Sequence, residues 1–93
     1  MKRIPTHPGA ILKDELQARA LSINRFAQAL HVPTGRISQI IAGKRSVSPD
    51  TALRLARYFR TSPEVWLNLQ MQYDLAVAAR DHGSRIEKEV HAA

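Results

Sequence analysis

Apolar residues recur at helical spacing in five successive segments of the chain, and proline or serine stands at the start of each. The first segment begins at His7-Pro8, where proline is tolerated because the first N–H groups of a helix have no partner within it. Ser22, Ser48 and Ser62 are predicted N-caps of later segments. The pattern predicts helices over residues 8–19, 23–30, 33–42, 49–59 and 63–80. We expect an all-α chain, because no stretch alternates with period two and no hairpin signal appears.

The segment 26–43 has the spacing of a helix-turn-helix. Val32-Pro33 ends the helix before it, since the residue preceding proline is driven out of the α region, and Gly43 ends the next. Six apolar residues stand where the two helices would contact each other and the first helix: Phe26, Ala27, Leu30, Val32, Ile37 and Ile40. A plain helical bundle is the alternative, because any three-helix core yields a similar pattern.

Composition and charge favour a nucleic-acid partner. The chain has 93 residues and a net charge of +6. Residues 19–60 contain eight arginines and lysines and one acidic residue, Asp50, whereas residues 61–93 carry more acidic than basic groups. A polyanion would therefore be held by the middle of the chain, the alternative being solvated surface charge.

Polar residues of the segment 33–42 are the candidate DNA contacts. We expect bases to be read by Thr34, Arg36, Ser38 and Gln39, with Gly35 allowing close approach of the backbone. Arg36 suits guanine and Gln39 suits adenine. The DNA backbone would be held by Asn24, Arg25, Lys44 and Arg45.

Four strings of residues resemble the HigA-type antitoxins, a VapI-like branch of the Xre/Cro-like helix-turn-helix repressors. They are PTHPGAILKDEL, VPTGRISQIIAGKR, DTALRLARYF and TSPEVWLNLQMQYDL, and the resemblance covers residues 4–75. It implies a five-helix, lambda-repressor-like domain. It also implies a homodimer that represses its own operon at a palindromic operator and neutralises a HigB-like toxin, typically a ribosome-associated enzyme that cleaves mRNA.

The chain departs from the family pattern at three positions. His31 stands where the turn usually has glycine, and histidine tolerates a positive φ at modest cost. Ile23 replaces a polar residue, so one usual phosphate contact is expected to be absent. Gly35 lies inside the predicted recognition helix, which implies either close backbone approach to DNA or a helix that orders only on binding.

The last predicted helix is apolar around more than one face, as a helix with two partners would be. Val65, Leu69 and Ala76 are expected to close the core. Trp66, Tyr73 and Val77 are expected at a dimer interface, the alternative being that Trp66 and Tyr73 complete one enlarged core. Residues 1–80 are predicted to form the domain, and 81–93 a charged tail with a helical turn or two at most.

Other chemistry is not indicated by the sequence. With no cysteine, disulfides and thiolate zinc sites are excluded and a cytoplasmic location is expected. The four histidines lack metal-ligand spacing, no glycine-rich phosphate loop follows a strand, and no apolar run approaches the ~18 residues of a membrane span. We therefore expect no enzymatic activity, cofactor, metal or membrane partner. The leading hypothesis is an autorepressor that is also an antitoxin; the alternatives are a stand-alone repressor and a toxin-binding module with weak DNA binding.

Overall fold

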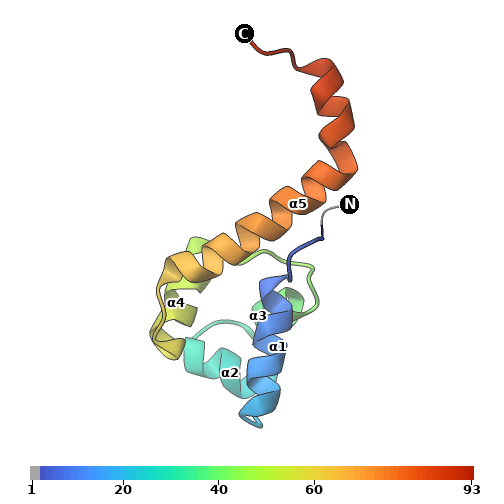
Figure 1. Ribbon diagram of the computed structural model, residues 1–93. Coiled ribbons are helices and arrows are strands. Elements are labelled where there is room, and N and C mark those ends of the chain that lie inside the picture. The colour runs from blue at the N-terminus through green and yellow to red at the C-terminus, as the bar shows by residue number, and fades with distance from the viewer. Residues whose placement is uncertain (1–2) are drawn as a thin grey trace.

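Five α-helices form the chain in a computed structural model that describes residues 3–93 (Figure 1). They are α1 (Pro8–Ala18), α2 (Ile23–Leu30), α3 (Thr34–Ile41), α4 (Pro49–Phe59) and α5 (Pro63–Glu89). No strand occurs within the described range. The predicted all-α, five-helix fold is confirmed, and the predicted starts of the helices lie within one residue of the observed ones.

Side-chain caps explain where most of the helices begin. Ser22, Ser48 and Ser62 each accept a hydrogen bond from the backbone N–H three residues later, as predicted. The cap of α1 was missed: the Nδ1 atom of His7 accepts from the N–H of Gly9 at 2.9 Å. Pro33, at the cap position of α3, provides no such bond.

The core lies where α1, α2, α3 and α4 converge and the first half of α5 covers them. Its fully buried side chains include Leu12, Phe26, Ile37, Ile40 and Leu55. The backbones of α1 and α3 come very close, since a Cβ on Gly9 would overlap the carbonyl group of Ile40. The apolar residues predicted to join the helix-turn-helix are indeed buried, apart from half-buried Val32.

The face of α5 that closes the core agrees with the prediction only in part, since Leu69 packs against the core and Ala76 is half-buried. Val65 is 45% exposed, whereas Trp66 and Gln70 are buried. The indole of Trp66 packs against Phe59. Gln70 accepts a hydrogen bond from the N–H of Val47 at 2.9 Å. A buried glutamine at this position bonds the loop before α4, and apolar spacing alone does not predict that contact.

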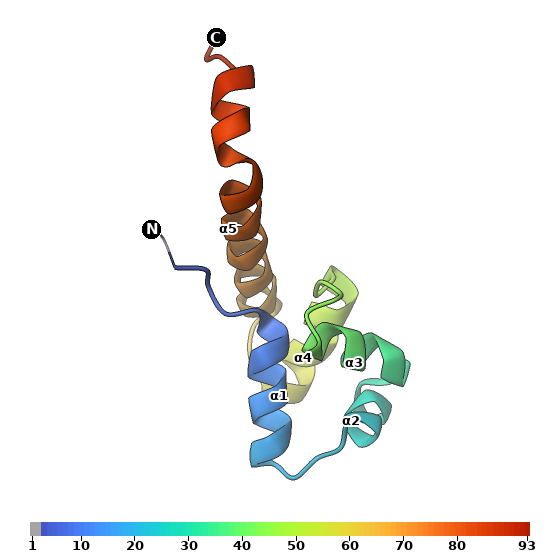
Figure 2. The same ribbon diagram turned by 90° about the vertical axis from the view of Figure 1, so that its right-hand side faces the viewer.

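The second half of α5 extends beyond the prediction and projects from the other helices (Figures 1 and 2). The chain is accordingly elongated, with extents of 49 × 23 × 20 Å. A helix end at residue 80 was wrong, because residues 84–89 favour helix and Arg85 pairs with Glu89 one turn later at 3.8 Å. The division of the chain at residue 80 stays a prediction. No helix of the described part is long and apolar enough to cross a membrane.

Candidate nucleic-acid interface

Helices α2 and α3 and the turn between them have helix-turn-helix geometry. Helix α2 ends at Leu30, and its C-cap residue His31 has a left-handed φ of 58°, as the sequence predicts for this departure from glycine. The N–H of Val32 then bonds the carbonyl of Ala27 at 3.0 Å, which closes the turn. Ile37 and Ile40 bury the inner side of α3, so the opposite side faces away from the core.

The outer side of α3 presents short polar groups to solvent. Thr34, Gly35 and Gln39 are exposed, and Ser38 is half-buried with its hydroxyl donating to the carbonyl of Gly35 at 3.2 Å. A Cβ on Gly35 would meet nothing within 4 Å. No contact within residues 3–93 therefore requires glycine here. Helix α3 is regular through Gly35, and close approach of its backbone to DNA stays a prediction.

The amino ends of α2 and α3 are joined by a hydrogen bond. The Thr34 hydroxyl donates to the Asn24 side-chain oxygen at 2.6 Å, so the structure brings together one candidate base contact and one candidate phosphate contact. Arg25 is exposed beside them, while its backbone N–H is held by Ser22. Ile23 is half-buried against the core and offers no polar group, as its departure from the family pattern implied.

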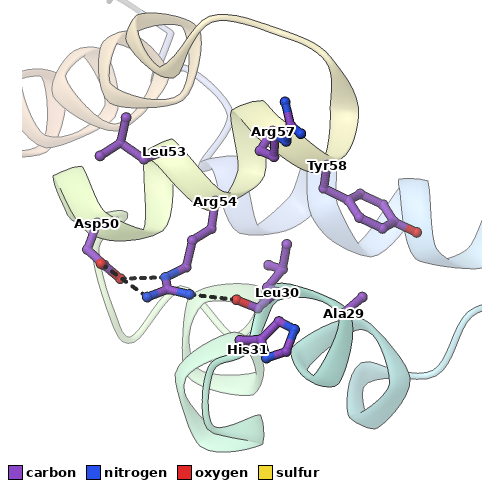
Figure 3. A pocket seen from close by; sticks show the side chains of 8 residues that line it. All are labelled: Ala29, Leu30, His31, Asp50, Leu53, Arg54, Arg57 and Tyr58. Carbon is purple, nitrogen blue, oxygen red and sulfur yellow. Dashed lines mark hydrogen bonds and ion pairs between the residues drawn. The ribbon is translucent and has the colours of Figure 1, made fainter.

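Arg36 takes part in an ion-pair network that sequence reasoning did not find. Its Nη1 donates to Asp50 Oδ2 at 2.8 Å. Arg54 donates to the same oxygen from Nε at 2.9 Å and to the carbonyl of Leu30 from Nη1 at 2.9 Å (Figure 3). Hydrogen bonds from Arg54, and to a smaller extent from Arg36, lower the pKa of Asp50. The sequence offered one sign of this network: in residues 19–60, which hold eight arginines and lysines, Asp50 is the only acidic residue.

Two basic side chains lie beyond the carboxyl end of α3, next to its exposed side. Lys44 and Arg45 are exposed in the loop after the helix, and the N–H of Lys44 bonds the carbonyl of Gln39 at 2.8 Å. A surface depression joins Arg45 to Arg36 and Arg54. Donors and positive charge thus surround the exposed side of α3, an arrangement suited to a polyanion with polar groove edges.

The predicted dimer residues lie in different environments. Trp66 is 4% exposed, and its Nε1 donates to the Thr61 hydroxyl at 3.0 Å, so it belongs to the chain's own core, as the alternative to a dimer contact expects. Tyr73 is half-buried with its ring edge-on to His7, and Val77 is half-buried. The large apolar side chains that α5 exposes are instead Val65, Met71, Leu75 and Ile86. No group of metal-ligating side chains occurs in residues 3–93.

The chain matches known helix-turn-helix proteins in sequence and in structure. A family model described as helix-turn-helix matches residues 12–66. Virulence-associated protein I of Dichelobacter nodosus is 47% identical over 79 residues, which cover 84% of this chain and 73% of that protein.

Two solved structures extend the likeness over nearly the whole fold. An addiction module antidote protein of the HigA family from Coxiella burnetii has a TM-score of 0.91 and 48% identity, covering 98% of this chain and 100% of the other. The Pseudomonas aeruginosa antitoxin HigA, solved with the higBA promoter, has a TM-score of 0.89 and 43% identity, covering 94% and 96%.

Proposed function

Because the chain belongs to the HigA family of helix-turn-helix proteins, we propose that it represses its own operon by binding an operator and is the antitoxin of a toxin–antitoxin pair. The observation that carries the DNA-binding part is the exposed outer side of α3, with Arg36 and Gln39 among its polar groups and cations on both flanks. The Pseudomonas relative was solved with promoter DNA, which supports operator binding by this chain.

Base reading and backbone binding fall to different residues of this surface. Thr34, Arg36, Ser38 and Gln39 contact base edges, because they lie along α3, which enters the major groove in this fold class. Asn24, Arg25, Lys44 and Arg45 contact phosphates, because they lie at the start of α2 and in the loop after α3.

Binding to a duplex selected from a random-sequence library tests this assignment. Affinity for the selected duplex should fall steeply between ~50 and 200 mM salt and still exceed that for unrelated DNA by ~10³ or more. Arg36→Ala should relax discrimination at one base position, by ~1–3 kcal/mol. Lys44→Ala should weaken binding to all sequences alike. Equal, sequence-independent losses in both variants would contradict the division of labour, and weak, unselective binding by the wild type would favour the toxin-binding module.

A homodimer would place two copies of α3 about 34 Å apart, in successive major grooves of a palindromic operator. With Trp66 in the core, the surface of α5 left for this contact holds Val77, the edge of Tyr73 and exposed Leu75. Light scattering at micromolar concentration should give twice the monomer mass. A monomer with undiminished operator affinity would rule the dimer out.

A HigB-like toxin is the expected protein partner, supported by the relative named as an addiction module antidote. DNA and a ribosome-associated toxin would both place the protein in the cytoplasm. Co-expression with the reading frame next to its gene tests the pairing: growth arrest by that product alone, relieved by this chain, supports it. If that product is harmless and does not bind the chain, the protein is a stand-alone repressor.

A further inference from the structure

We propose that Asp50 is a specificity-determining residue, which positions Arg36 for one base and weakens the attraction of this surface to DNA of any sequence. The inference rests on the proposed function, because it concerns how α3 reads an operator. Asp50 itself is not expected to contact a base, so it acts as a positioning residue.

The contact between Asp50 and Arg36 leaves part of the guanidinium group available. Only Nη1 donates to Asp50, while Nε and Nη2 form no hydrogen bond within the described chain. The Arg36 side chain is 28% exposed. An arginine held in this way has less rotamer freedom to lose on binding, and its remaining donors can pair with the two acceptors of guanine.

Asp50 is itself held in place from two sides. It lies in the first turn of α4, where the helix dipole favours a negative charge. Arg54, one turn later, bonds both Asp50 and the carbonyl of Leu30 at the end of α2 (Figure 3). The network thus links α2, α3 and α4, and it fixes the direction from which Arg36 leaves the surface.

The negative charge of Asp50 also opposes unselective binding. It offsets one of the two arginines that it bonds, on a surface with further cations at Lys44 and Arg45. Phosphates attract every cation regardless of sequence, so an acid at this point weakens binding to all DNA. In the operator, the hydrogen bonds between Arg36 and a correctly placed guanine compensate for this loss of affinity. Unrelated DNA lacks that compensation, so the ratio of specific to unselective affinity rises.

Replacing Asp50 by asparagine tests the proposal, and the chain contains a matched control. Ser62-Pro63-Glu64 repeats Ser48-Pro49-Asp50 at the start of α5, and Glu64 forms no ion pair among residues 3–93. Asp50→Asn and Glu64→Gln therefore remove the same charge from the same helix position, but only the first removes the carboxylate partner of Arg36 and Arg54. Melting temperatures of both variants show whether the fold is retained.

Binding is measured with the selected duplex, with its single-base variants and with unrelated DNA. In Asp50→Asn, affinity for unrelated DNA should rise about threefold, in line with one fewer negative charge. The penalty at the base position that Arg36→Ala identifies should fall from at least tenfold to less than threefold. Penalties at the other positions should be unchanged, a selectivity that a general loss of structure would not produce. Glu64→Gln should behave as the wild type does.

The double variant Arg36→Ala/Asp50→Asn separates the two roles. Its affinity for unrelated DNA should stay higher because Asp50 is replaced. Its discrimination at the base position should be no lower than that of Arg36→Ala alone, since Arg36 is already absent. If Asp50→Asn retains the full penalty at that position, Arg36 reads its base without help and the proposal is wrong. If the wild type itself fails to discriminate between duplexes, the proposed function fails instead.

Discussion

The two sides of α3 illustrate two different reasons for the presence of a residue. On the inner side, Ile37 and Ile40 are fully buried and Gly9 of α1 lies directly against the Ile40 carbonyl, so packing determines each residue. On the outer side, a Cβ on Gly35 would have open space and Gln39 is exposed, so no side-chain contact within residues 3–93 determines either residue. We propose that the operator, rather than the fold, accounts for residues of this second kind.

Gly9→Ala should have the largest effect of any single methyl group added to the chain. Its Cβ would overlap the Ile40 carbonyl, and separating α1 from α3 should destabilise the fold by about 3 kcal/mol. Urea denaturation would measure the loss. Gly83→Ala is the control, since the nearest side chain to its Cβ is 4.0 Å away, and a midpoint unchanged in Gly9→Ala would contradict the close packing of α1 on α3.

Gln39→Ala tests the outer side at a residue that the fold does not need. Because Gln39 is exposed, stability should change by less than about 0.5 kcal/mol, while discrimination at one adenine of the operator should fall by ~1–3 kcal/mol. Gln72→Ala, exposed on α5, should alter neither quantity. Discrimination retained in Gln39→Ala would remove this residue from the reading surface.

The inner side of α3 was predictable from sequence, because apolar spacing indicates which residues are buried and proline indicates where the helices begin. Ile37 and Ile40 are buried as predicted, and the serine caps set the starts of α2, α4 and α5. The buried face of α5 was not predictable in this way, because Gln70 is buried through its hydrogen bond to Val47. The spacing of apolar residues does not predict a hydrogen bond of this kind.

The exposed candidate residues were also predictable, but their internal contacts were not. Arg36 and Asp50 are 14 positions apart, and Asn24 and Thr34 are ten apart, so both pairs depend on how separate helices are packed. Helical spacing describes residues within one helix and does not extend across turns. The Arg36–Asp50 pair could be recognised only once α3 and α4 were placed in space.

Gly35→Ala should change stability and binding in opposite directions. The added methyl group has open space, so the free energy of unfolding should rise by about 0.5–1 kcal/mol, whereas operator affinity should fall if the backbone of α3 approaches the duplex closely. Gly83→Ala, also within a helix, should stabilise the chain without affecting DNA binding. Operator affinity unchanged in Gly35→Ala would mean that the duplex does not come close at this point.

The smallest expected effect is a loss of folding stability in acid, which arises at the start of α1, on the inner side of α3. His7 caps α1 by accepting a hydrogen bond at Nδ1, which requires that nitrogen to be unprotonated. Burial lowers the pKa of His7, although nearby Asp74 opposes this. The unfolded chain then binds the proton more readily than the folded chain. The contribution of His7 is complete above its unfolded pKa of about 6.5 and is lost as the pH falls below that value and through the folded pKa.

Thermal unfolding at pH 7.5, 6.5 and 5.5 measures this contribution. The melting temperature of the wild type should decrease over this range, whereas His7→Asn should be less sensitive, because asparagine can cap the helix through a group that does not titrate. His91→Asn, exposed near the chain end, should follow the wild type. Equal acid sensitivity in His7→Asn and the wild type would show that another group is responsible. Since Ile40 packs on the turn that His7 caps, acid should weaken the support of α3 through its inner side.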